Sequence, residues 1–241
     1  MLFDEVHIVT PTLKTANKDA VANAAKALNV SFPVGYEEFV TRFGKGIFSN
    51  WVRVYMPDRI VAEITEFRER WAEFYFWEED KKTEILESLI LADTVEGDEL
   101  LYHPTLNKFY YLPRGGERTW DPGSTFIEAI QFSRKSGKVM SFNSGLNRSS
   151  QTYCGEIVLR TLCEKLSSLP VVSITDISDE DTEDPFFEAF VSEICGSIVV
   201  ESEDWDETAE TEAFVEYDAT SDPSAIAKIT SILESFDLEL N

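Results

Sequence analysis

The chain has 241 residues, of which 43% are hydrophobic and 12% aromatic, so it holds enough apolar material to build folded cores. The formal net charge is −24, and most of it lies in residues 170–241, where 21 acids accompany a single base, Lys228. Such a segment repels phosphate backbones, which argues against direct binding of nucleic acid and for a cationic protein partner.

The length suits two domains, and two features of the sequence mark where they meet. The charge changes near residue 170, and a stretch at 135–150 is rich in Ser, Gly, Asn and Lys without a hydrophobic period, as is typical of a linker. We therefore expect a first domain over 1–148, linker included, and a second, acidic domain over 149–241.

No run of residues approaches 18 consecutive apolar positions, and the first residues include two acids where a signal peptide needs bases. We therefore expect a cytoplasmic protein without membrane contact. The cysteines Cys154, Cys163 and Cys195 lack a C-x-x-C spacing and lie among apolar neighbours, which favours buried free thiols over disulfides. The sequence does not fix the oligomeric state.

In the first domain, apolar residues at three- and four-residue spacing predict helices, and alternating β-forming residues predict strands. Helices are predicted over 16–28, 34–43, 57–77 and 125–133. Strands are predicted over 51–56, 85–92, 99–103 and 108–112. Gly44 is expected to end the second helix and Ser124 to cap the fourth. The turn-forming sequences EGD and HPTLN between the last three strands indicate an antiparallel meander.

In the second domain, the apolar positions predict the element order α-β-α-β-β-α. The predicted helices run over 154–166, 187–194 and, after a cap at Asp222 or Ser224, 226–233. The predicted strands run over 171–177, 197–201 and 213–217. We therefore expect a smaller acidic α+β domain after the first domain, folded rather than a disordered tail.

Residues 28–46 read LNVSFPVGYEEFVTRFGKG, a hydrophobic segment that ends in proline, followed by a helix with aromatic anchors and a glycine stop. This segment resembles the SUKH superfamily. Phe32 and Pro33 begin the family's motif. Its helical positions are filled by Tyr36, Phe39 and Val40, and its stop by Gly44 and Gly46. Lys45 separates the two glycines, and the family's usual Asn is absent.

Two further segments are similar to the family's pattern, so the resemblance covers residues 15–132. Residues 97–113, GDELLYHPTLNKFYYLP, resemble its paired strands, and the helix around Phe126 resembles its closing helix. The superfamily includes yeast regulators of cell-wall synthesis and many bacterial immunity proteins. The resemblance implies an α+β fold, with a mostly antiparallel sheet flanked by helices, that serves as a binding scaffold without chemistry of its own.

Two clusters of acids in the second domain are the candidate partner-binding residues. The first is Asp179, Glu180, Asp181, Glu183 and Asp184. The second is Glu201, Glu203, Asp204, Asp206 and Glu207, which flank Trp205. The first cluster either binds a partner, stays a solvated loop or holds calcium, although Asp184 stands where an EF-hand requires glycine. Trp205 is either an exposed interface anchor or a residue that packs over the sheet edge.

Signatures of catalysis are absent from the sequence. The two histidines, His7 and His103, lie in different predicted strands without a nucleophile pattern, and the carboxylates of Asp98 and Glu99 belong to a turn. No glycine-rich nucleotide loop and no G-x-S-x-G elbow occurs. Core or sheet packing, rather than a ligand cage, is expected for Trp51, Trp71, Trp77 and Trp120. We therefore expect no enzyme activity, no cofactor and no metal site.

The acidic segment and the resemblance together predict a non-catalytic cytoplasmic immunity protein that binds a bacterial toxin domain, for instance a nuclease, and neutralises it by occlusion. Nuclease active sites face polyanions and are therefore basic, so an acidic protein can cover them. The alternative is a SUKH-type scaffold or regulator that binds a housekeeping protein. A third and less favoured class is an enzyme with a metal at the first acidic cluster.

Overall fold

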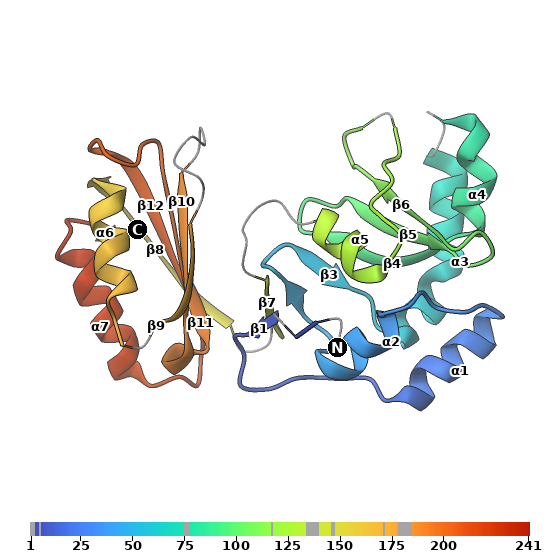
Figure 1. Ribbon diagram of the computed structural model, residues 1–241, viewed down its shortest axis with the longest axis horizontal. Helices are drawn as coiled ribbons and strands as arrows, with labels where there is room; N and C mark the ends of the chain where they lie inside the picture. The colour runs from blue at the N-terminus through green and yellow to red at the C-terminus, as the bar shows by residue number, and fades with distance from the viewer. Residues whose placement is uncertain are drawn as a thin grey trace. The chain divides into compact units, whose positions relative to one another are not determined.

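The computed structural model divides into two compact units, both of which combine helices with β-sheet, so the expected α+β fold is confirmed (Figure 1). The described residues are 3–4, 6–74, 78–116, 118–133, 140–145, 148–170, 172–177 and 185–241. The first unit comprises Met1–Val6 and Thr12–Lys135. The second unit comprises Ser136–Asn241 and also takes in His7–Pro11 from the start of the chain.

The first unit is built on strands in the order β2-β3-β4-β5-β6, and each neighbouring pair is antiparallel. The strands are β2 (Ile47–Phe48), β3 (Val52–Val54), β4 (Leu89–Thr94), β5 (Glu99–His103) and β6 (Lys108–Leu112). The helices are α1 (Lys18–Leu28), α2 (Tyr36–Arg42), α3 (Pro57–Phe74), the 3-10 helix η1 (Glu79–Lys81), α4 (Lys82–Glu87) and α5 (Phe126–Phe132). The predicted meander is confirmed, and β5 and β6 have the predicted bounds.

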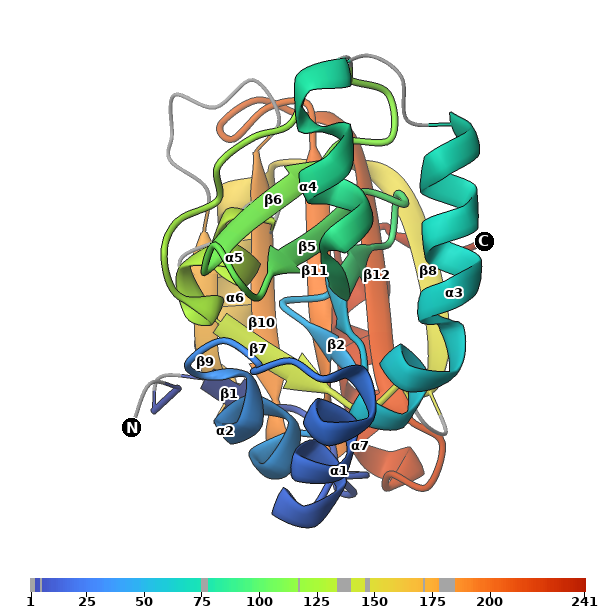
Figure 2. The same ribbon diagram turned by 90° about the vertical axis from the view of Figure 1, so that its right-hand side faces the viewer.

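Helices lie on both faces of this sheet. On one face, the Phe132 ring of α5 contacts the Tyr111 ring of β6, with the centroids 5.3 Å apart. On the other face, Trp71 of α3 donates a hydrogen bond from Nε1 to Glu99 of β5 at 2.6 Å. Figure 2 shows α4 over β5 and β6 on this same side. The sheet of the first unit is therefore largely enclosed by its own helices.

The predicted glycine stop of α2 is confirmed by the backbone geometry. Gly44 has a φ of +80°, in the left-handed region that side chains rarely adopt. A Cβ at this position would also lie 2.0 Å from the carbonyl oxygen of Lys14, with which Gly44 forms a parallel bridge. Only glycine fits this turn.

Three details of the first unit differ from the sequence prediction. One strand is predicted over 85–92, but Ile85 is the buried residue of α4, and the strand begins at Leu89. The N-cap of α5 is Thr125 rather than Ser124, because Thr125 forms a capping box with Glu128. Trp120, for which core or sheet packing is expected, lies outside the core and is 58% exposed, although its backbone bridges Tyr111 of β6.

A carboxylate just before η1, that of Glu78, holds the loop that carries Trp120. Lys81 donates a hydrogen bond to Glu78 at 2.7 Å, and the Thr119 backbone N–H donates a second one. Burial alone would raise the pKa of Glu78, but these hydrogen bonds outweigh burial and lower the pKa to about 2. Ionised Glu78 therefore ties two segments of the first unit together.

The lowered pKa of Glu78 predicts a pH-dependent contribution to stability. The contribution is fully present above the usual pKa of 4.5 and is lost as the pH falls towards about 2. We expect Glu78→Gln to flatten the fall in the free energy of unfolding over this pH range, as measured by urea denaturation of both proteins. Parallel pH profiles for the two proteins would contradict this role of Glu78.

The second unit is built on a sheet of order β13-β8-β12-β11-β10-β9, in which each neighbouring pair is antiparallel. The strands are β8 (Arg148–Ile157), β9 (Val172–Ile177), β10 (Phe186–Val191), β11 (Gly196–Ser202), β12 (Ala209–Asp218) and β13 (Glu239–Leu240). The helices are α6 (Leu159–Ser167), the 3-10 helix η2 (Ser192–Ile194) and α7 (Pro223–Glu234). Two further strands, β1 (Val6–Ile8) and β7 (Met140–Asn143), pair with each other.

The helix predicted over 187–194 is wrong. Residues Phe186–Val191 form β10, and only the next three residues turn as η2. Phe187, Ala189 and Val191 join the buried core at every second position, which is the period of a strand. The aromatic positions also fit a helical spacing, so pairing with β9 and β11 decides between the two structures.

Two other predictions for the second unit are also corrected. The helix predicted over 154–166 begins only at Leu159, because the residues up to Ile157 continue β8, which pairs with β12 along its whole length. The stretch 135–150, predicted as a linker, contains β7 and the first residues of β8. Residues 134–139, 146 and 147 of that stretch lie outside the described residues.

Candidate protein-binding face

The two faces of the second unit's sheet differ in what covers them. Helices α6 and α7 lie against one face (Figure 1). The cross-strand row on that face is Phe187, Val200, Ala213 and Tyr153, all fully buried. Because successive side chains of a strand point to opposite faces, the residues next to these four in β8, β11 and β12 belong to the other face of the sheet, opposite α6 and α7.

That second face carries rows of carboxylates. Glu201 of β11 lies directly opposite Glu212 of β12, and Glu212 and Glu239 both lie opposite Cys154 of β8. In the neighbouring row, Glu210 lies opposite Glu156. We call the five exposed residues Glu156, Glu201, Glu210, Glu212 and Glu239 the acidic sheet face.

No base of the described residues forms an ion pair with the acidic sheet face. Arg148 pairs with Glu216 at 3.0 Å, and Arg160 pairs with Asp206 at 2.6 Å. Lys165 and Lys228 belong to α6 and α7, the helices that cover the opposite face. Within the described residues of the second unit, these exposed carboxylates therefore have no base that neutralises their charge.

Trp205 packs in the core, so the alternative prediction, that it is an exposed interface anchor, is wrong. Its side chain is 7% exposed and belongs to the same cluster as the residues of α6 and α7. Arg160 lies over the indole ring, with its guanidinium carbon 5.9 Å from the ring centroid, and its backbone N–H donates to the Trp205 carbonyl at 3.1 Å. Trp205 therefore anchors the loop between β11 and β12 from inside.

Two predicted acids of this loop shape it. The Asp204 carboxylate accepts the backbone N–H groups of Asp206 and Glu207, both at 2.8 Å. The hydrogen bond from Arg160 lowers the pKa of Asp206. Glu203 and Glu207 are exposed at the loop surface, and Glu201 belongs to the acidic sheet face. The second predicted cluster thus divides into a structural part and an exposed part.

The first predicted cluster lies outside the described residues. Its members are Asp179, Glu180, Asp181, Glu183 and Asp184. The three alternatives for them, namely binding of a partner, a solvated loop and a calcium site, therefore stay predictions. The residues that flank the segment are described. Ile177 lies opposite Phe187, and the Pro185 carbonyl accepts the Ser202 backbone N–H at 3.1 Å. Ile177 and Pro185 therefore lie at the same end of the sheet as the loop of Trp205.

Four members of the acidic sheet face, namely Glu156, Glu210, Glu212 and Glu239, are not predicted as site residues from the sequence. For two of them the sequence does contain a pattern that indicates a shared face. In the sequence ETEAFVEYD of β12, Glu210, Glu212 and Glu216 alternate with other residues at the period of a strand. For Glu156 and Glu239 only the register between strands reveals the placement.

Comparison with known proteins gives no relative. No family model matches the chain, and neither the curated proteins nor the solved structures yield a match. The similarity to the SUKH superfamily therefore stays a prediction from the residues, and the site is interpreted from its own geometry.

Both histidines have packing or turn contacts. His103 is buried, and its Nδ1 accepts the Leu106 backbone N–H at 3.2 Å, which is a turn contact. His7 lies against the Phe190 ring, with the centroids 5.4 Å apart, and burial lowers its pKa. The two histidines and the cysteines form no group of three metal-ligand side chains with Asp or Glu in the described part of the chain.

The three cysteines are free, as expected, but only one is buried. Burial raises the pKa of the Cys163 thiol to about 12, which makes it unreactive. Cys154 and Cys195 are half-buried. Among the described helices, none is both long and apolar enough to cross a membrane.

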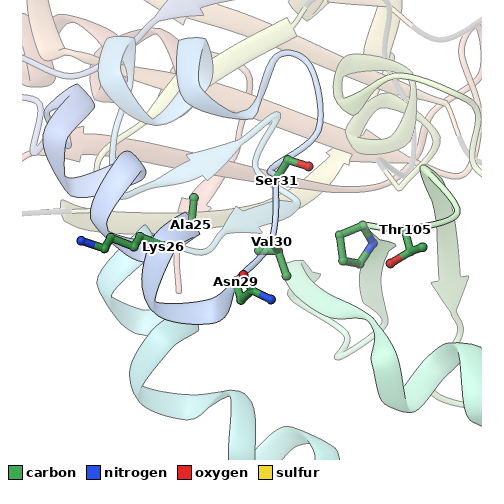
Figure 3. Close-up of a pocket in the computed structure, with 7 residues that line it drawn as sticks. Ala25, Lys26, Asn29, Val30, Ser31 and Thr105 are labelled. Atoms are coloured by element: carbon green, nitrogen blue, oxygen red, sulfur yellow. The ribbon is translucent and has the colours of Figure 1, made fainter.

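A surface hollow of about 520 Å³ lies in the first unit, between the end of α1 and the turn after β5 (Figure 3). It is lined by Ala25, Lys26, Asn29, Val30, Ser31, Pro104 and Thr105. Lys26 is the one ionisable side chain of this lining, so the hollow has no pair of acid–base groups and no carboxylate, imidazole or thiol for a metal. It does not compete with the acidic sheet face as the functional site.

The opposed carboxylates predict that the face costs stability. Like charges directly across two strands destabilise a sheet, so we expect Glu212→Gln to raise the free energy of unfolding by about 0.2–1 kcal/mol at low salt. Salt should reduce the gain, because it screens exposed charges. Glu164→Gln is the control, since Glu164 lies on helix α6 and belongs to no cross-strand pair. An unchanged stability of Glu212→Gln at low salt would contradict the repulsion.

Proposed function

We propose that this protein is a non-catalytic binding protein that neutralises a bacterial toxin domain by covering its basic surface with the acidic sheet face. The observation that carries the proposal is the row in which Glu201 and Glu212 lie directly opposite each other, exposed and without an ion pair to any base that the structure describes. Such an arrangement weakens the fold, so a role in binding accounts for it better than a role in stability.

Occlusion follows from charge and position. A toxin that acts on nucleic acid needs Lys and Arg to hold phosphates, and its active site is therefore cationic. The acidic sheet face, with the exposed Glu203 and Glu207 at its end, offers the complementary field. Steering by such a field raises association rates by roughly 10–1,000-fold at low salt. Bound there, the protein would exclude substrate without any chemistry of its own.

The first unit supports the proposal through its resemblance to the SUKH superfamily, which includes bacterial immunity proteins. Its proposed role is that of a scaffold in the cytoplasm, without cofactor or metal.

One observation favours the alternative function, a regulator that binds a housekeeping protein. Trp120 and Phe132 are 58% and 44% exposed, and an apolar surface of this kind suits a partner that is not recognised by charge.

Co-expression with the toxin encoded beside this gene tests the proposal. We expect the tagged protein to retain the toxin domain at 50 mM salt, to lose it progressively as salt increases, and to abolish its toxicity in the cell. Glu201→Gln/Glu212→Gln should weaken retention, whereas Glu164→Gln/Glu234→Gln, with the same charge change on α6 and α7, should not. Absence of any complex with the neighbouring gene product would contradict the proposal.

A further inference from the structure

Next to the carboxylate rows, the sheet face opposite α6 and α7 carries an apolar row. Val199 of β11 lies opposite Phe214 of β12, and Phe214 lies opposite Thr152 of β8. All three side chains are partly exposed. The row lies two residues along the strands from Glu201 and Glu212, which is about 6–7 Å.

The chain's own start covers the next row of this face. Phe190 and Ser197 lie opposite each other there and are buried. The His7 ring contacts the Phe190 ring, and Arg148 reaches both Glu216 of β12 and the Val9 carbonyl. Residues 7–11 thus occupy one end of the apolar strip, and the row of Val199 and Phe214 continues it without an equivalent cover among the described residues.

Carboxylates border the apolar row. Glu201 and Glu212 lie in the row before it, Glu188 lies opposite Val199 on β10, and Glu216, in the row after it, is already paired with Arg148. An apolar centre with a charged rim is the usual construction of a protein–protein interface. The charged rim selects a partner with a basic surface, and the apolar centre selects a partner with an apolar side chain to bury.

We propose that the partner places an apolar side chain, flanked by arginine or lysine, on the row of Val199 and Phe214. The inference rests on the proposed function and specifies its partner as a folded protein with an apolar residue inside a basic surface. A second copy of this chain does not fit, because its net charge of −24 opposes self-association. In this arrangement the carboxylates accelerate association, and the apolar contact slows dissociation.

Two heptapeptides of equal charge test the proposal on the full chain. In one, arginine alternates with phenylalanine, and in the other, arginine alternates with serine. Titration followed by NMR of the ¹⁵N-labelled protein should show both peptides at the acidic sheet face. The phenylalanine peptide should bind about tenfold or more tightly, as burial of an apolar ring predicts.

Variants of the apolar row separate its role from that of the carboxylates. Phe214→Thr keeps a strand-forming residue and should remove the difference between the peptides, and Val199→Thr should reduce it. Equal affinity of both peptides for the wild type, or a difference that persists in both variants, would overturn the apolar contact while leaving the acidic face as a binding site. Absence of peptide-induced shifts on this face up to millimolar concentration would overturn the proposed function as well.

Discussion

Trp205→Ala should lower the free energy of unfolding of the second unit by about 3–5 kcal/mol, the usual cost of truncating a buried aromatic residue. The side chain is 7% exposed and lies in the core between the sheet and α6. Its loss should also release the loop that contains Glu203 and Glu207. Urea denaturation followed by circular dichroism measures the loss, and hydrogen exchange assigns it to β10, β11 and β12.

Trp205→Phe is the matched control for this prediction. The indole N–H is buried and has no hydrogen-bond partner among the described residues. Removing it deletes an unsatisfied donor, so Trp205→Phe should cost less than about 1.5 kcal/mol, as for a conservative core substitution. If Trp205→Ala instead leaves stability unchanged and weakens only the binding of a partner, the core position of Trp205 is contradicted and the residue acts as an exposed anchor.

Reversing the charge of the acidic sheet face should slow association with the toxin domain. For Glu201→Lys/Glu212→Lys, we expect the association rate constant at low salt to fall by about 10-fold or more, because steering by the field is worth roughly 10–1,000-fold. Dissociation should change less. Stopped-flow or surface-binding kinetics at 20 and 150 mM salt measures both constants, and the difference between variant and wild type should shrink at the higher salt.

The control for net charge is Glu164→Lys/Glu234→Lys, which makes the same change on α6 and α7. Both residues are exposed on the helices that cover the opposite face. Only a small decrease in association rate is expected, because the overall charge changes while the local field at the acidic sheet face does not. Equal effects of the two double variants would show that net charge, rather than this face, governs association.

Local signals in the sequence predicted much of the first unit. Pro57 begins α3, Gly44 ends α2, and turn residues delimit β5 and β6, because each of these features depends on backbone chemistry within a few residues. The strand at Leu89 was extended too far because the apolar run from Ile85 continues through the end of α4. Periodicity alone does not separate a short helix from a strand when apolar residues are continuous.

The second unit shows what local signals leave undecided. Phe187, Phe190 and Val191 fit a helical spacing as well as a strand, and the partners β9 and β11, far along the chain, select the strand. The same holds for the candidate site. The acids at 201 and 203–207 were found by composition, whereas Glu156 and Glu239 join the face only through the register of β8 with its neighbours.

Trp205 illustrates why charge pattern alone misassigns roles. Four acids flank it within three residues, which suggests a solvent-exposed loop. In the fold the indole turns inward, Asp204 caps the turn, and Asp206 pairs with Arg160. The tertiary contact with Arg160, at the start of α6, cannot be inferred from the loop sequence. The carboxylates left for a partner are the exposed ones, and most of them lie on the sheet.

Zero-length carbodiimide cross-linking of the complex with the toxin domain, followed by mass spectrometry, shows which face binds the toxin, because it joins carboxylates to lysines in contact. We expect cross-links from toxin lysines to the acidic sheet face, in particular to Glu201, Glu212 and Glu239, and to the adjacent Glu203 and Glu207. Cross-links confined to Glu164 and Glu234 on the helices, or to acids of the first unit, would contradict this expectation.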